Sequence, residues 1–370
     1  MKGKKKRLCI IIPDHWAANM GGAEYQVKVL LDALRKENRY EIYYLARNVN
    51  PAFTPDGYTI IKIADSGGIR RYGTFLDAPR LLKILRDLKP DLIYQRVGCA
   101  YTGIAAYYAQ RHQCRMIWHI SSDKNVEPMK YGFTRNVAPQ FIEQQIMQYG
   151  ITHAHCIIAQ TLQQDALLQR NYGRHATAIV PNYHPKPSEN IHKSRPIKVL
   201  LIGKLHPLKQ PEVFVKLARD LQHIKEAQFI MIGPPDHDQV RHNRLLEEAG
   251  KLGNFVYLGR RSQEEVNALL AEAHVLVNTS QWEGFPNTFI QAWMRKVPVV
   301  SLNVNPDKVF DKENIGFYSR SYEKLREDVK RLIENDELRE SMGNDAQIYS
   351  YANHSAKNVQ RVIKLLEADC

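Results

Sequence analysis

The chain has 370 residues, of which 44% are hydrophobic and 25% charged, and its formal net charge is +13. These values are typical of a globular protein with two domains and exclude a disordered or fibrous chain. The apolar runs stay well below the roughly 18 residues that a membrane-spanning helix needs. The positive charge favours anionic partners, but no nucleic-acid-binding motif accompanies it, so we expect no nucleic acid partner.

The N-terminal segment joins a basic cluster to a short apolar run at residues 8–12. This run is too short for a signal peptide and no small-residue cleavage site follows it, so we predict a first core strand and a cytoplasmic protein. The cluster itself consists of Lys2, Lys4, Lys5, Lys6 and Arg7. It suits an anionic membrane surface on the inner face of the membrane, and it suits a frayed basic tail equally well.

Short apolar runs then alternate with amphipathic segments along the first half of the chain. We predict strands at residues 8–12, 42–45, 59–63, 92–95, 116–119, 156–159 and 178–180. Helical patterns lie between them, as at residues 23–34, where Val27, Leu30, Leu31 and Leu34 share one face. Residues 181–196 hold four prolines and almost no aliphatic side chains, which indicates an interdomain linker.

The same alternation resumes after the linker. We predict strands at residues 199–202, 229–232, 256–258, 275–277 and 299–302, with helices between them and a helical C-terminus beyond residue 322. Strands that alternate with helices indicate doubly wound α/β domains with parallel sheets. We therefore expect an N-terminal domain at residues 1–185, a C-terminal domain at 186–350, and a last helix within 351–370 that packs back on the first domain.

Ligands of such sheets bind beyond the carboxyl ends of the strands, so the loops there are where chemistry is expected. Gly21 and Gly22 follow the first strand and precede a helix, where backbone can approach a phosphate closely. Lys204 and Lys209 share the loop after the first strand of the second domain. Two lysines in one such loop suit a diphosphate.

The sequence NTSQWEGFPNTFIQAW carries the most specific local pattern. Glu283 and Gly284 lie in a loop after a strand, and a helix begins near Pro286. Within that helix Asn287 and Gln291 are four residues apart and share a face. Glu283 and these amides could bind sugar hydroxyls beside a phosphate at the helix N-terminus, or Glu283 could simply cap its own helix.

Taken together, these segments resemble the retaining glycosyltransferases of family 4, also known as glycosyl transferases group 1. The matching motifs occur in the family's order: GGAE at residues 21–24, PDLIY at 90–94, VPN at 180–182, GKLHPLKQP at 203–211, IMIGPP at 230–235, VYLGR at 256–260 and EGFPNTFIQAW at 283–293. The resemblance implies the GT-B fold, in which two Rossmann-like domains face each other across a cleft. The first domain would bind the acceptor and the second the nucleotide sugar.

The resemblance also implies an activity, the transfer of a sugar from a nucleotide-diphosphate-sugar donor to a hydroxyl with retention of anomeric configuration. The acceptor would be a sugar or a lipid-linked sugar, in cell-envelope, exopolysaccharide or glycolipid synthesis. No cofactor and no metal ion are expected. Two alternatives remain open, a sugar-nucleotide epimerase of the same fold and a non-catalytic basic protein that binds an anionic polymer or membrane.

Roles for single residues follow from the same resemblance. His119 would hydrogen-bond the reacting sugar, Lys204 and Lys209 would neutralise the departing diphosphate, and Glu283 would contact the donor sugar's hydroxyls. The donor would be held by Gly21, Gly22, Gly203, Gly233, Arg260, Gly284, Phe285, Pro286, Asn287, Thr288 and Gln291. Three positions depart from the family's usual pattern: Lys204 replaces an arginine, Gln291 a glutamate, and residues 303–306 (NVNP) a Gly-Gly pair.

Overall fold

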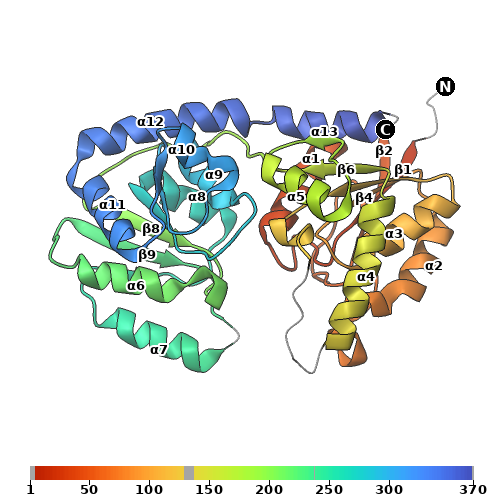
Figure 1. Ribbon diagram of the computed structural model, residues 1–370, viewed down its shortest axis with the longest axis horizontal. Coiled ribbons are helices and arrows are strands. Elements are labelled where there is room, and N and C mark those ends of the chain that lie inside the picture. The colour runs from red at the N-terminus through yellow and green to blue at the C-terminus, as the bar shows by residue number, and fades with distance from the viewer. Residues whose placement is uncertain (1–4, 129–136, 237, 369–370) are drawn as a thin grey trace. The chain divides into compact units, whose positions relative to one another are not determined.

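The structure is a computed structural model that describes residues 5–128, 137–236 and 238–368, and it consists of two compact units (Figure 1). The first unit is Met1–Asn182 together with Lys357–Cys370, and the second is Tyr183–Ala356. The sequence analysis placed these divisions at residues 185 and 350. The second division falls later because helix α12 (Asp336–Asn353) continues past residue 350. Lys2 and Lys4 of the basic N-terminal cluster lie outside the described residues.

A seven-stranded sheet forms the centre of the first unit, in the order β3-β2-β1-β4-β5-β6-β7. Its neighbouring strands pair in parallel, and each overlaps a strand predicted from the sequence. The strands are β1 (Lys6–Ile11), β2 (Tyr40–Ala46), β3 (Thr59–Lys62), β4 (Leu92–Arg96), β5 (Arg115–His119), β6 (Cys156–Ala159) and β7 (Ala178–Ile179). Strands β4 and β6 are buried on both faces, and their sequences contain apolar runs that cover all of β6 and the first three residues of β4.

Helices cover both faces of this sheet (Figure 1). They are α1 (Gly22–Glu37), α2 (Ala78–Leu88), α3 (Ala100–Arg111), α4 (Val137–His153), α5 (Leu162–Tyr172) and α13 (Lys357–Glu367), with the short 3₁₀ helices η1 (Gly68–Tyr72), η2 (Thr74–Asp77) and η3 (Asp123–Asn125). Helices α3 and α4 cross at Gly103 and Gly150. A Cβ on Gly103 would lie 1.8 Å from the carbonyl oxygen of Ile146, so this crossing requires glycine.

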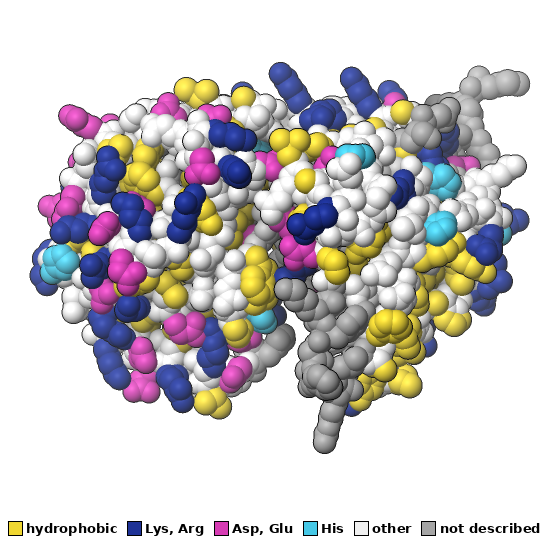
Figure 2. All heavy atoms as spheres, viewed as in Figure 1, with side chains coloured by type: hydrophobic (Ala, Val, Ile, Leu, Met, Phe, Trp, Pro, Cys, Tyr) yellow, Lys and Arg dark blue, Asp and Glu magenta, His cyan; other side chains and the backbone are white. Residues whose placement is uncertain are grey.

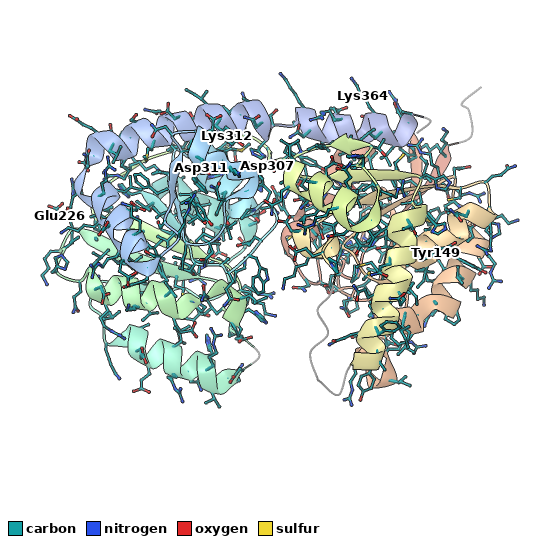
Figure 3. The ribbon with its side chains drawn as sticks, viewed as in Figure 1. Tyr149, Glu226, Asp307, Asp311, Lys312 and Lys364 are labelled. Carbon is teal, nitrogen blue, oxygen red and sulfur yellow. The ribbon has the colours of Figure 1, made fainter. Side chains whose placement is uncertain are left out.

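The last helix, α13, belongs to the first unit although the second unit separates it in sequence. Its Val362 and Ile363 are buried, while Lys364 is exposed and projects from the opposite side of the helix (Figure 3). The Asn358 amide donates to the carbonyl of Pro181 at 3.1 Å, and Arg361 donates to that of Ile179 at 2.7 Å. Side-chain hydrogen bonds to the end of β7 and the residues after it thus fix the helix to the first unit.

The second unit contains a six-stranded sheet in the order β10-β9-β8-β11-β12-β13. Its strands are β8 (Ile197–Ile202), β9 (Ala227–Ile232), β10 (Phe255–Tyr257), β11 (Val275–Asn278), β12 (Val299–Ser301) and β13 (Gly316–Tyr318). The sequence analysis missed β13, which is three residues long and only partly buried. The other five strands were predicted.

Side chains alternate between the two faces of this sheet, as β8 shows. Val199 and Leu201 pack with α6 (Pro211–Asp220), α7 (Gln239–Gly250) and α11 (Tyr322–Glu334). Leu200 packs on the other face with α8 (Gln263–Glu272), α9 (Asn287–Met294) and α12. The remaining helices are η4 (Pro207–Lys209), η5 (Pro306–Lys308) and α10 (Val309–Lys312). Both units are therefore doubly wound α/β domains. The loops that follow their strands are where the sequence analysis expected the candidate residues.

No helix among the described residues is long and apolar enough to cross a membrane.

Candidate functional site

Loops at the carboxyl ends of β8, β9 and β10 are joined to one another in the second unit. The Gly203 N–H donates to the carbonyl of Ile232 at 2.9 Å, and the Gly233 N–H donates to that of Gly259 at 2.9 Å. A Cβ on Gly233 would lie 1.8 Å from the carbonyl oxygen of Gly203, so only glycine allows these two strand ends to approach so closely. These glycines leave an edge of backbone without side chains beside the loop that carries Lys204 and Lys209, which we call the lysine loop.

The lysine loop runs from Gly203 into η4 and brings Lys209 to the segment that follows β11. The Gln281 N–H donates to the carbonyl of Leu208 at 2.8 Å, and the Thr279 hydroxyl donates to that of Lys209. Lys209 then forms an ion pair with Glu283, with its Nζ 2.7 Å from Oε1. Lys204, from the same loop, is exposed and is not a partner of Glu283.

Glu283 receives three donors, and all of them bind the same carboxylate oxygen. Besides the Lys209 ammonium, Oε1 accepts hydrogen bonds from the Asn278 amide at 2.9 Å and the Ser280 hydroxyl at 2.6 Å. Burial raises the pKa of Glu283, but Lys209 and the two hydrogen bonds outweigh it and hold that pKa below its usual value. Oε2 receives no hydrogen bond from the residues that the structure describes. Glu283 is therefore an ionised carboxylate with one oxygen fixed and the other available.

This arrangement excludes one of the two interpretations that the sequence left open, because Glu283 does not cap α9. The helix begins at Asn287 after an N-cap Pro286, with no side-chain cap and no acidic residue in its first turn. Asn287 and Thr288 are half-buried there. Phe285 anchors the loop, since its ring is buried 4.6 Å from that of His354. Thus no acidic side chain of α9's own first turn neutralises the positive end of the helix dipole.

Gln291 lies in α9 on the side that faces α8. Its Nε2 donates to Oδ1 of Asn267 at 3.1 Å, and its side chain is almost fully buried. Asn267 also accepts from Gln263 at 3.2 Å, so the amide of Gln291 is held in one orientation. The described residues offer its Oε1 no donor. A buried amide with its oxygen unused can accept a hydrogen bond from a ligand hydroxyl, as the glutamate expected at this position would.

The loop after β12 carries residues 303–306, where the resembling family has two glycines. Asn303 donates to the carbonyl of Ser280 at 3.3 Å, and Ser301 accepts from the Val304 N–H at 3.2 Å. Beyond it, Asp307, Asp311 and Lys312 lie together around α10 (Figure 3). The side-chain amide of Asn303 thus joins this loop to the segment that carries Glu283. Arg260 and Gly259 lie after β10, where Arg260 is exposed.

In the first unit, Gly21 and Gly22 lie at the N-terminus of α1, and both are exposed. The carboxylate of Glu24 lies against the backbone of Gly21, in the geometry of one half of a capping box. Burial raises the pKa of Glu24 to about 7. The start of α1 thus has a carboxylate close to its N–H groups, and that carboxylate gains and loses a proton near neutrality.

His119 ends β5 and is fully buried beside two residues of β4. Its Nδ1 lies 2.8 Å from the Tyr94 hydroxyl and 3.2 Å from Nη1 of Arg96. Burial and the neighbouring guanidinium hold the pKa of His119 well below its usual value, so the ring is neutral. The sequence analysis gave Tyr94 only as the last residue of the motif PDLIY and did not single out Arg96. The only available signal was a pair of polar residues, Gln95 and Arg96, at the end of a strand.

The predicted site residues therefore form separate groups within each unit. Lys209 and Glu283 are paired, with Gly203, Gly233 and residues 284–288 on neighbouring loops, and Gln291 lies one helical turn further along α9. Sequence reasoning missed Asn278 and Ser280 as partners of Glu283, although both stand among polar residues just where β11 ends.

Comparisons with known proteins concern the family and the fold of the chain. Residues 185–349 match the family model of glycosyl transferases group 1. An uncharacterized glycosyltransferase of Methanocaldococcus jannaschii is 25% identical over 246 residues, which cover 60% of this chain and 58% of that relative's length. The chain therefore matches only part of that protein.

Solved structures resemble the chain over nearly its whole length, and HepE and WaaG are two of them. The Anabaena protein HepE in complex with UDP and glucose has a TM-score of 0.74 at 14% identity, covering 99% of this chain and 100% of that one. WaaG, a glycosyltransferase involved in lipopolysaccharide biosynthesis, has a TM-score of 0.75 at 12% identity, covering 97% and 99%. At such identities the likeness shows the fold, which is the two-domain α/β GT-B fold of glycosyltransferases.

Proposed function

We propose that this protein is a retaining glycosyltransferase of family 4 that transfers a sugar from a nucleotide-diphosphate-sugar donor to a hydroxyl acceptor. The observation that carries the proposal is the carboxylate of Glu283, whose Oε1 takes three donors and whose Oε2 takes none among the described residues. A fixed, ionised carboxylate with one unused oxygen is suited to accept hydrogen bonds from two neighbouring sugar hydroxyls. The Lys209 ammonium beside it suits the diphosphate to which that sugar is attached.

The remaining residues of the second unit fit the other parts of such a donor. The N–H groups of Phe285, Asn287 and Thr288 and the helix dipole of α9 favour phosphate oxygens. The backbone edge at Gly203 and Gly233 lets a phosphate approach without steric conflict, and Lys204 and Arg260 add positive charge. Gln291 would accept a hydrogen bond from a ribose hydroxyl through its Oε1. HepE was solved with UDP and glucose, which supports a uridine nucleotide as the first donor to test.

The reaction forms a bond between the acceptor oxygen and the anomeric carbon while the bond from that carbon to the phosphate oxygen breaks. Negative charge grows on the departing phosphate, where Lys209 and the α9 N-terminus stabilise it. The acceptor attacks from the face that the phosphate leaves, so configuration is retained, and the proton of its hydroxyl passes to the departing phosphate. No metal ion takes part in this proposal, so a chelator is expected to leave the transfer rate unchanged.

Donor binding and transfer can be tested in sequence. Thermal unfolding in a panel of nucleotide sugars should reveal the donor, because a ligand at about 100 times its Kd adds roughly 2.7 kcal/mol to the free energy of unfolding. Incubation of that donor with polysaccharide and glycolipid acceptors should then yield a glycoside with the donor's anomeric configuration. An epimerised nucleotide sugar instead would establish the epimerase, and an absence of stabilisation by every donor would contradict the proposal.

We place the reaction in the synthesis of a cell-envelope polysaccharide, exopolysaccharide or glycolipid, with a sugar or lipid-linked sugar as acceptor, on the cytoplasmic side of the membrane. The likeness to WaaG supports this proposed role.

An exposed surface on the first unit also supports this proposed role at the membrane. In η1, Ile69 and Tyr72 are exposed at 70% and 42%, and Arg70 and Arg71 lie between them in sequence.

More residues of the same kind extend this surface. The exposed positions of α2 include Arg80, Lys83 and Arg86, and α4 exposes Phe141 and Ile142. Figure 2 shows hydrophobic side chains gathered over α2, α3 and α4, with lysine and arginine along the edge near α2. Exposed apolar and basic side chains together suit an anionic lipid surface, where the apolar groups enter the interface and each basic residue contributes about 1 kcal/mol.

Vesicle binding tests this surface. Co-sedimentation with vesicles that contain anionic phosphatidylglycerol is expected, and it should weaken steeply as salt is raised. The variant Arg71→Ser/Lys83→Ser, which changes two exposed basic residues of this surface, should bind several-fold less, while Arg219→Ser, on the second unit, should bind as the unmodified protein does. Binding that is equal for neutral and anionic vesicles, or equal in both variants, would contradict the assignment.

A further inference from the structure

A cluster in the first unit joins the ends of β4 and β5. Arg96 and His119 are register partners across these strands. Nη1 of Arg96 lies 3.2 Å from Nδ1 of His119 and 3.3 Å from the Tyr94 hydroxyl oxygen, while Nη2 donates to Oδ1 of Asn182 at 2.8 Å. All three side chains of β4 and β5 are buried.

The direction of these hydrogen bonds is fixed by chemistry. A guanidinium carries N–H donors and no acceptor. Nδ1 of His119 therefore accepts a hydrogen bond from Arg96 through its lone pair and carries no proton. The Tyr94 hydroxyl oxygen accepts from Arg96, which leaves its proton for the same Nδ1 at 2.8 Å. Burial raises the pKa of Tyr94, so this proton is present at neutral pH.

We propose that Tyr94 and Arg96 are positioning residues that lock His119 in the tautomer with its proton on Nε2, so that His119 can only donate a hydrogen bond to substrate and cannot act as a general base. A neutral imidazole carries one proton, and with Nδ1 unprotonated that proton is on Nε2. The lock follows from the contacts around Nδ1. The identity of the acceptor of the Nε2 bond rests on the proposed function.

The chemistry of the acceptor follows from the surroundings of Nε2. This atom is buried and has no hydrogen-bond partner among the described residues. Nε of Arg96 is also buried and has no hydrogen-bond partner among them. An unpaired buried donor is unfavourable, and a ligand oxygen that pairs with it removes the penalty. No ion pair joins Arg96 to a carboxylate in the described part of the chain, so its charge favours an electron-rich oxygen. Such an oxygen is that of a ligand hydroxyl or of a ligand phosphate.

The tautomer can be observed without any assay of activity. In protein labelled with ¹⁵N-histidine, proton–nitrogen correlation through the ring should show His119 with a protonated Nε2 and a bare Nδ1, assigned by its loss in His119→Gln. Tyr94→Phe should keep this pattern because Arg96 alone requires an acceptor at Nδ1. Tyr94→Phe combined with Arg96→Leu should populate the other tautomer. A protonated Nδ1 in the unmodified protein would overturn the proposal.

Kinetics test the donor role with a matched pair of amides. A glutamine amide can reach the place of Nε2, whereas an asparagine amide reaches only that of Nδ1. We expect His119→Gln to keep most of kcat/KM and His119→Asn to lose about tenfold, the effect of one hydrogen bond. Equal losses in both variants would overturn the donor role. If no nucleotide sugar is used by the unmodified protein while the tautomer is as expected, the proposed function fails and the lock stands.

Discussion

Replacement of Lys209 by methionine is expected to lower kcat for sugar transfer by about 10²- to 10³-fold, the range seen when one preorganised donor to a developing negative charge is removed. Two effects combine in this variant. The ammonium that would stabilise the departing diphosphate is lost, and Glu283 loses the strongest of its three partners. Methionine keeps the length of the side chain, so the fold should remain.

The same variant has a second expected signature, in the pH profile. Lys209 is the main group that lowers the pKa of Glu283 against the effect of burial. Without it, the pKa of Glu283 should rise, and the acid limb of the pH–rate profile should move to higher pH. Above this pKa the carboxylate is ionised and active, and activity is lost as the pH falls through it.

Two further variants make the test specific. Glu283→Gln removes the charge but keeps the shape, and because Lys209 and Glu283 act as a pair, the double variant should lose much less than the product of the two single losses. Lys198→Met is the matched control. Lys198 lies near the start of β8, forms an ion pair with Glu272 and belongs to the same strand that leads to Lys209. Full activity in Lys209→Met, or an equal loss in Lys198→Met, would contradict the assigned role.

The fold was largely predictable from the sequence because parallel strands covered on both faces carry apolar runs. Strand β6 is apolar throughout, and β9 is apolar except for Gln228. Strand β13 was missed because it is short, lies at the edge of its sheet and buries only Gly316 fully. The second division between the units was placed a few residues early because the predicted boundary at residue 350 lies within α12, which ends at Asn353.

The candidate site was predictable only in part, since its contacts join residues far apart in sequence. The periodicity of the sequence predicts that Lys209 and Glu283 lie at strand ends. It does not predict that Lys209, Asn278 and Ser280 share one oxygen of Glu283. This sharing depends on hydrogen bonds between two loops, such as Gln281 to Leu208, which no local pattern encodes. Arg96 was missed for a related reason. A charged residue at a strand end is usually exposed, and only the structure shows this one fully buried beside His119.

A buried ion pair in the first unit should have the largest effect on stability. Asp77, at the end of η2, is fully buried, and its Oδ2 lies 2.8 Å from Nε of Arg47 and accepts from the Tyr101 hydroxyl. Arg47 also donates to the carbonyl of Gly73 at 2.8 Å and to that of Arg70 at 3.1 Å. Through these bonds one carboxylate holds the segment of η1 and η2 to the end of β2 and to α3.

Replacement of Asp77 by alanine is expected to lower the free energy of unfolding of the first unit by about 3–5 kcal/mol, because Arg47 is left as a buried charge without its partner. That is a large share of the roughly 5–15 kcal/mol that stabilises a folded domain. Urea denaturation followed by circular dichroism measures this loss.

Asp77→Asn should lose less stability, since its amide oxygen still accepts hydrogen bonds from Arg47 and Tyr101. Asp65→Ala, which breaks an exposed pair with Lys62 nearby in sequence, should leave stability almost unchanged. Similar losses in Asp65→Ala and Asp77→Ala would show that burial of the pair is not what makes Asp77 important.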